Sequence, residues 1–246
     1  MTRGRDDFYV GYRPQAPRGL AKWLRGTIVA LAIAGAVIGF TLASGQSVFS
    51  DGIFEFGLDK DFEGELVVDP YPALVIDDTP HLLVERGKAG ARESLRELAG
   101  STVRATGQLI YRGEHRMIEL SPAEVEVTGA AQAAGSEEIA AGRHELVGEI
   151  LDSKCYLGVM KPARGKAHRA CAALCIRGGI PAMLLVTDER GDTLHLLLTD
   201  PAGRPLGKEL LDLVAEPVRV VGEISRRNGL WALAAEVEDF ERLGGS

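Results

Sequence analysis

An internal repeat constrains the fold of this chain more than any other feature of its sequence. Three short segments occur twice, in the same order, in the part of the chain after residue 50. The pairs are Gly64-Glu65-Leu66 with Gly148-Glu149-Ile150, residues 103–107 with 218–222, and residues 123–126 with 235–238. Self-similarity of this kind predicts two related structural units.

Both copies have the same predicted order of elements: three strands, one helical segment and two more strands. This order is typical of the OB-fold, a small closed barrel, although an antiparallel α+β sheet remains an alternative. The expected strands are 63–69, 73–76, 81–85, 102–111 and 116–127 around a helix at 91–99, and then 145–151, 182–187, 193–198, 217–226 and 230–240 around a helix at 207–214. Gly113 and Asn228-Gly229 mark the hairpin turns.

An uncharged, mostly apolar stretch precedes the repeat and predicts a single transmembrane helix over residues 26–47. Ahead of it lies a basic segment, residues 1–25, with a net charge of +4 from Arg3, Arg5, Arg13, Arg18, Lys22 and Arg25 against Asp6 and Asp7. Basic flanks stay in the cytoplasm, so the remainder of the chain is expected to be exported. A cleaved signal peptide ending near Ala43-Ser44-Gly45 is the rival interpretation.

The predicted fold class is therefore mainly β: one N-terminal transmembrane helix, then two OB-fold-like barrels. The expected boundaries are a first barrel over 51–128, a linker over 129–142 and a second barrel over 143–242. The whole chain has 28 basic and 35 acidic residues, and its basic excess lies before the apolar stretch. The exported part is consequently acidic, and we expect no nucleic-acid partner.

The second copy contains an insertion between its expected first and second strands. The first two markers are 39 residues apart in the first copy, from Gly64 to Val103, and 70 apart in the second, from Gly148 to Val218. The corresponding loop of an OB-fold belongs to its binding face. We therefore expect any specialised chemistry within residues 153–181.

All three cysteines of the chain lie in this insertion, together with one histidine. Asp152 is followed by Cys155, His168, Cys171 and Cys175. A helix over 166–177 would place the histidine and the last two cysteines on one side. Three thiolates and one imidazole predict a tetrahedral metal site, with zinc the default ion and iron or copper less favoured.

Two other roles for the cysteines remain open at this level. In an oxidising compartment Cys155 could form a disulfide with Cys171 or Cys175 and leave one thiol over, and a catalytic thiol is the third alternative. The segment 153–187 contains no Asp or Glu but six basic residues, which predict a positive patch or thiols of lowered pKa. They are Lys154, Lys161, Arg164, Lys166, Arg169 and Arg177.

The insertion motif carries a resemblance to a family. The pattern Asp152-x-x-Cys155, His168-x-x-Cys171-Ala172-x-x-Cys175 and Gly179-x-Pro181 resembles that of exported bacterial OB-fold domains. With residues 8–12 (FYVGY) ahead of the span and Pro70-Tyr71-Pro72 after it, the chain looks like uncharacterised bacterial single-span membrane proteins with exported tandem OB-fold-like domains. The resemblance implies an association with membrane redox enzymes.

Three functions are compatible with these residues. The first is a membrane-anchored, non-enzymatic binding or accessory module whose Cys/His site docks a membrane redox enzyme. The second is a thiol-disulfide oxidoreductase using Cys155, Cys171 and Cys175, although the chain has no Cys-x-x-Cys. The third is a saccharide binder using Tyr111, Tyr156 and Trp231. The other histidines, His81, His115, His144 and His195, show no spacing pattern of their own.

Overall fold

The computed structural model describes residues 17–45, 51–122, 125–130 and 138–244. Residues 8–12 and 123–124, and the middle of the expected linker, lie outside this part. The chain divides into two compact units, residues 1–49 and 50–246.

The first unit contains one long helix, α1 (Arg18–Gly45). It is long and apolar enough to cross a membrane, by length and composition. Thr27 and Thr41 donate their hydroxyl hydrogen bonds to carbonyl oxygens of the preceding turn, at Trp23 and Val37. Both hydroxyl groups therefore have hydrogen-bond acceptors within the helix. Polar groups need such internal partners in an apolar environment, where no water is present.

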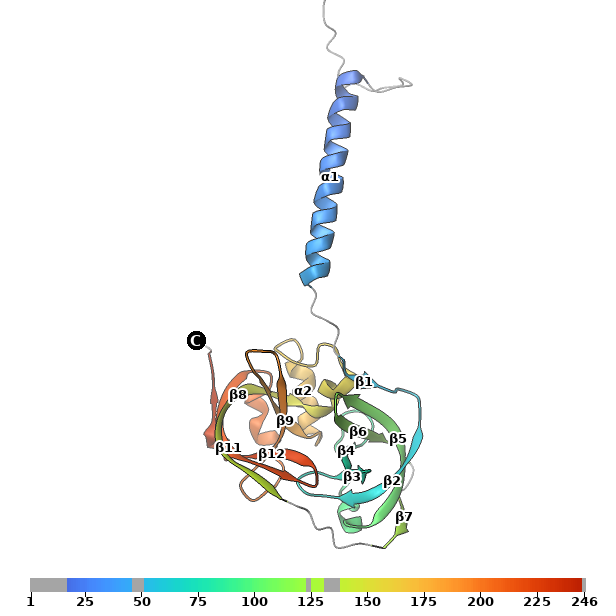
Figure 1. Cartoon of the computed structure of the whole chain (residues 1–246), viewed down its shortest axis with the longest axis vertical. Coiled ribbons are helices and arrows are strands. Elements are labelled where there is room, and N and C mark those ends of the chain that lie inside the picture. The colour runs from blue at the N-terminus through green and yellow to red at the C-terminus, as the bar shows by residue number, and fades with distance from the viewer. Residues whose placement is uncertain (1–16, 46–50, 123–124, 131–137, 245–246) are drawn as a thin grey trace, which may run out of the picture. The chain divides into compact units, whose positions relative to one another are not determined.

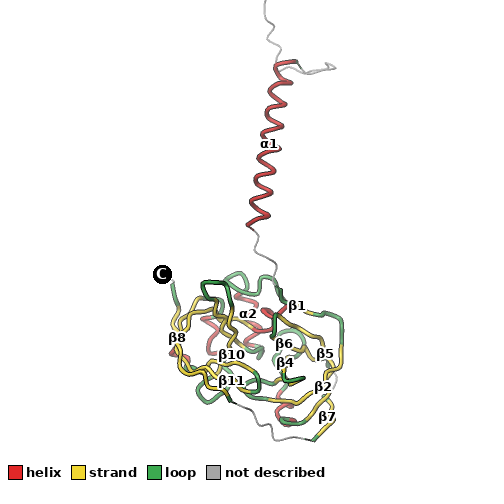
Figure 2. The backbone as a smooth tube through the Cα atoms, viewed as in Figure 1, coloured by secondary structure: helices red, strands yellow, loops and turns green. Residues whose placement is uncertain are grey.

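The second unit contains two five-stranded barrels, side by side in Figure 1 and mostly strand in Figure 2. The closed path of the first is β2-β3-β4-β6-β5-β2, and that of the second is β8-β9-β10-β12-β11-β8. In both, the third and fifth strands of the barrel run parallel, and the other pairs are antiparallel. Two barrels with this strand order fit an OB-like fold.

The elements of the first barrel are β1 (Ile53–Phe54), β2 (Lys60–Val67), β3 (Ala73–Ile76), β4 (Thr79–Val84), the 3₁₀ helix η1 (Glu93–Leu98), β5 (Thr102–Arg112), β6 (His115–Leu120) and β7 (Glu126–Gly129). Those of the second are β8 (Ile139–Asp152), η2 (Cys155–Val159), α2 (Arg169–Arg177), β9 (Ala182–Thr187), β10 (Thr193–Thr199), the 3₁₀ helix η3 (Lys208–Leu213), β11 (Pro217–Arg227), β12 (Leu230–Ala234), the 3₁₀ turn η4 (Val237–Asp239) and β13 (Phe240–Arg242).

The repeat markers contain glycine at four positions where a neighbouring strand leaves no room for a side chain. A Cβ atom at Gly64 would collide with the carbonyl oxygen of Val75, and one at Gly148 with that of Leu185. Gly107 and Gly222 are crowded in the same way by the carbonyls of the strands that follow them. The neighbouring backbones approach closely here, and only glycine leaves the necessary space.

Several expected boundaries differ from the structure. The expected strand 116–127 ends at Leu120, before Ser121-Pro122, because proline has no N–H for a strand ladder. The expected strand 230–240 ends at Ala234, where Glu236 and Asp239 form a capping box. The expected helices at 91–99 and 207–214 are short 3₁₀ turns.

The first strand of the second barrel also starts earlier than expected. β8 begins at Ile139 and pairs with β11 along its length, with a register shift at Ile224. Gly142 lies opposite this shift with a φ of 87°, a left-handed conformation that glycine adopts without strain. Residues 139–142 of the expected linker therefore belong to strand β8.

The unit has three cores, and one of them lies between the barrels. The interior of each barrel forms its own cluster of buried side chains. The third cluster takes side chains from both barrels, including Leu82 and Met117 of the first and Leu157, Met183 and Leu197 of the second. The two barrels thus share buried apolar surface, the main favourable term in folding.

Candidate metal centre

Asp152 fixes the start of the insertion. It is the last residue of β8 and is fully buried. One carboxylate oxygen accepts a hydrogen bond of 2.8 Å from the backbone N–H of Cys155, and the other lies 3.1 Å from Nε2 of His168. A single carboxylate thus holds the first cysteine and the histidine of the motif in place.

Helix α2 carries the other two cysteines. It is shorter than expected, beginning at Arg169, and the buried His168 is its N-cap residue. Ala172 and Ile176 pack into the interior core of the second barrel, which orients the helix. Cys175 is buried and Cys171 partly exposed, next to the shared core.

The three sulfur atoms lie close together without forming a disulfide. Cys155 Sγ is 4.0 Å from Cys171 Sγ and 3.9 Å from Cys175 Sγ, and all three thiols are free. In a tetrahedral zinc site with Zn–S bonds of about 2.3 Å, the sulfurs would stand about 3.8 Å apart. The two separations from Cys155 Sγ are close to this value, whereas Cys171 and Cys175 belong to different groups of neighbouring donor atoms.

Two overlapping groups of donor atoms result. Donor atoms of Cys155, His168 and Cys171 all lie within 4.8 Å of one another, and so do those of Asp152, Cys155 and Cys175. Cys155 belongs to both groups. Both oxygens of Asp152 already have hydrogen-bond partners, the backbone N–H of Cys155 and Nε2 of His168.

The cysteines differ in acidity because they share hydrogen bonds. The pKa of Cys175 is lowered by the hydrogen bond with Cys155 and by the Lys88 ammonium nearby. The pKa of Cys155 is raised by the same sulfur contact, by burial and by Asp152. Cys175 is therefore the more readily ionised of the two.

The expected positive patch of the insertion is smaller than its six basic residues suggest. Lys154 is buried, and its ammonium lies 2.5 Å from a carboxylate oxygen of Glu119 in the first barrel. Arg169 pairs with Glu216 at 2.7 Å. The four exposed cations are Lys161, Arg164, Lys166 and Arg177.

The structure also brings together two histidines that have no sequence pattern. Nδ1 of His195 lies 2.6 Å from Nε2 of His115, and Nε2 of His195 lies 3.3 Å from the hydroxyl of Tyr156. Burial, His115 and Arg112 lower the pKa of His195 to about 4. The pair forms across the two barrels, which no spacing in the sequence indicates.

A cleft of about 390 Å³ lies at this histidine pair. Its lining includes His115, Arg116, Met183, His195 and Trp231, which come from both barrels. Of the three expected stacking aromatics, Trp231 lines this cleft. No local sequence signal could have identified it, since its lining comes from several separate segments of both barrels.

Comparison with known proteins adds nothing to these observations. No protein-family model matches the chain, and no curated protein or solved structure gives a significant match. Any function must therefore be inferred from the geometry of its own residues.

Proposed function

We propose that this protein is a membrane-anchored accessory module whose second barrel binds one metal ion through Cys155, His168, Cys171 and Cys175. The separations of Cys155 Sγ from the other two sulfurs, 4.0 and 3.9 Å, carry this proposal. They support a tetrahedral ion more than a disulfide, whose S–S bond is about 2.05 Å long. Three thiolates with one imidazole favour zinc over iron or copper.

The environment of His168 supports the same assignment. Histidine ligands commonly donate their second ring N–H to a carboxylate, which fixes the tautomer and the ring orientation. Asp152 stands in that position and is completely buried. The same carboxylate lies within 4.8 Å of the sulfur atoms of Cys155 and Cys175, so it links the histidine to the thiols.

The test is metal analysis of the full chain, purified in detergent from its native compartment, together with a count of free thiols. We expect one metal ion per chain and three thiols that become reactive when a chelator is added. His168→Ala should lose the ion and lower the unfolding temperature, since binding energy at a structural site is folding energy. His144→Ala is the matched control, because His144 is exposed and its ring nitrogen hydrogen-bonds the carbonyl of Ala141 within its own strand.

A disulfide would give a different result. Preparations with no metal, one reactive thiol and no response to His168→Ala would contradict the metal proposal. They would leave a covalent link between Cys155 and one helix cysteine as the role of the motif.

Thiol-disulfide exchange is the second candidate function. The opposite pKa directions of Cys155 and Cys175, with their sulfurs 3.9 Å apart, resemble an attacking thiolate and its partner thiol. Reduction of a disulfide substrate by the metal-free protein, abolished by Cys175→Ser, would support it. Equal rates for the wild type and this variant would exclude it.

The location of the module is part of the proposal. Residues 26–47 would anchor the protein in the bacterial inner membrane as a single-pass helix, with the basic segment 1–25 inside and both barrels exported. There the module would dock a membrane redox enzyme and bind no nucleic acid. A periplasmic reporter fused after Ser246 should be active, and the mature chain should retain its N-terminal segment. A mature N-terminus at or near Gln46 would contradict the anchor.

A further inference from the structure

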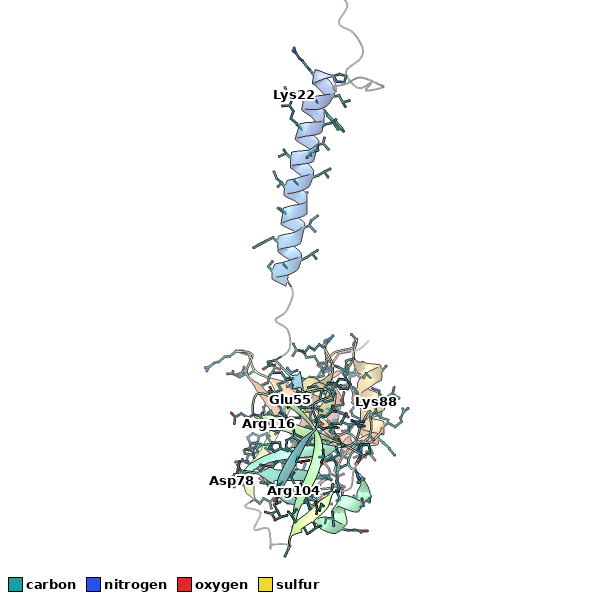
Figure 3. All side chains as sticks on the ribbon, turned by 90° about the vertical axis from the view of Figure 1, so that its right-hand side faces the viewer. Lys22, Glu55, Asp78, Lys88, Arg104 and Arg116 are labelled. Atoms are coloured by element: carbon teal, nitrogen blue, oxygen red, sulfur yellow. The ribbon has the colours of Figure 1, made fainter. Side chains whose placement is uncertain are left out.

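A loop of the first barrel lies against the cysteines of the second. The loop, residues 85–92, follows β4, and its Lys88 is labelled in Figure 3 at the edge of the unit. The ammonium nitrogen of Lys88 is 2.8 Å from Cys171 Sγ and 3.4 Å from Cys175 Sγ. It is a cation whose hydrogen bonds reach two of the three expected thiolate ligands.

The same loop is held in place by contacts that do not involve Lys88. The buried ammonium of Lys154 donates to the carbonyl oxygens of Glu85 and Gly87, at 2.8 and 2.7 Å. The backbone N–H of Gly90 donates to the carbonyl of Gly178, just after α2, at 2.9 Å. The position of Lys88 is thus set by the packing of one barrel on the other.

The charge of the site gives such a cation a role. Three thiolates around a divalent ion leave a net charge of −1, and the buried Asp152 adds another negative charge. Lys154 does not offset it, because it is paired with Glu119. A hydrogen-bonding ammonium next to the thiolates reduces the repulsion between them and strengthens an otherwise over-negative site.

We propose that Lys88 is a positioning residue of the metal centre, an outer hydrogen-bond donor to Cys171 and Cys175. The site in the second barrel is then completed by a side chain from the first. This inference rests on the proposed metal function. It adds that metal affinity depends on the contact between the barrels and that, by linkage, the bound ion strengthens this contact.

The experiment measures zinc affinity of the full chain in detergent by competition with a chromophoric chelator. Lys88→Met removes the charge and the donor but keeps most of the unbranched side chain, and it should weaken zinc binding by about 10-fold to 100-fold, as loss of an outer-shell partner typically does. Lys88→Arg should retain most of the affinity. Lys60→Met is the control, since Lys60 is an exposed lysine of the same barrel paired only with Glu55.

Hydrogen exchange over residues 85–92 separates this role from a purely structural one. In the zinc-free proteins Lys88→Met should exchange like the wild type, because Lys154 and Gly178 still hold the loop. Zinc should slow exchange in this loop in the wild type and less in the variant. A weaker affinity accompanied by faster exchange in the zinc-free variant would overturn the inference, since the loop itself would then have moved.

Failure of this inference is distinguishable from failure of the proposed function. If the wild type binds no zinc, the metal function is wrong. If the wild type and Lys88→Met bind zinc equally tightly, the metal function stands and only the role of Lys88 is lost.

Discussion

The two barrels use the same connection, between their first and second strands, in different ways. In the first barrel residues 68–72 link β2 to β3 and present Tyr71, whose hydroxyl donates hydrogen bonds to carbonyls of the second barrel. In the second barrel residues 153–181 link β8 to β9 and present the thiols and His168, facing a loop of the first. The same connection of the same barrel fold therefore makes a packing contact in the first copy and contains the candidate metal site in the second.

The contacts are also reciprocal, which indicates that the pair of barrels acts as one body. The hairpin of the second barrel contacts the first, where Asn228 donates to the carbonyl of Asp69 at 2.8 Å. The hairpin of the first contacts the second through His115 and His195. Since these contacts surround a shared core, changes at the interface should reach the cysteine site even when they are distant in sequence.

The largest expected effect comes from breaking the buried ion pair between the barrels. Lys154→Met leaves Glu119 buried, 7% exposed and without its cation. Removing one partner of a buried pair typically costs about 3 to 5 kcal/mol. Urea unfolding of the full chain should therefore show a much lower free energy of unfolding.

A second pair from the same insertion sharpens this comparison. Arg169 pairs with the buried Glu216 but is itself 40% exposed, so water can reach the pair and Arg169→Met should cost less than Lys154→Met. The double change Lys154→Met with Glu119→Leu should recover part of the loss, since an apolar pair can replace a buried ion pair. Equal effects of Lys154→Met and Arg169→Met would contradict the distinction.

The sequence was sufficient for the parts of the fold that depend on local patterns. Alternating strands, the turns at Gly113 and Asn228-Gly229 and the repeat predicted the strands of both barrels closely, and both turns have the positive φ angles expected of tight hairpins. The extra length of the second copy located the segment that carries the cysteines. These features depend on residues near one another in the chain or on comparison of one copy with the other.

What the sequence could not give depends on how one barrel packs on the other. Lys88 and Cys171 are 83 positions apart, and Lys154 lies 35 positions from Glu119, the carboxylate with which it pairs. The pairing of His115 with His195 likewise arises only across the interface. No periodicity encodes such contacts, because each barrel satisfies its own strand pattern independently of its neighbour.

The histidine pair gives an intermediate, pH-dependent effect. The pKa of His195 in the folded protein is about 4, below the 6.5 of an exposed histidine, so unfolding takes up a proton between these values. The pKa of His115 is lowered in the same direction by burial and by Arg116. The stabilisation that comes from keeping these histidines neutral should therefore be fully present above pH 6.5 and should be lost as the pH drops toward 4. At pH 5 the free energy of unfolding should be lower by about 2 kcal/mol because of His195.

The check is the free energy of unfolding measured between pH 7 and pH 5. His195→Gln should flatten its dependence on pH, whereas His144→Gln should leave it unchanged. A wild type whose stability does not change over this range would show that the histidine pair is not kept neutral by the interface.

The smallest expected effect concerns the connection of the first barrel. The hydroxyl of the buried Tyr71 lies 2.9 Å from the carbonyl oxygen of Leu198 and 3.3 Å from that of Leu206, both in the second barrel. Tyr71→Phe keeps the ring in the shared core and removes only these bonds. The carbonyl of Leu198 still accepts from the backbone N–H of Leu206, so the loss should be about 1 kcal/mol.

Tyr111→Phe, on a partly exposed tyrosine of β5, should have almost no effect. Zinc affinity should not change in either variant, because Tyr71→Phe removes only a hydroxyl whose acceptors, the carbonyls of Leu198 and Leu206, are not donor atoms of the cysteine site. A Tyr71→Phe protein that binds zinc less tightly would show that the two connections, despite their different lengths, serve a single site.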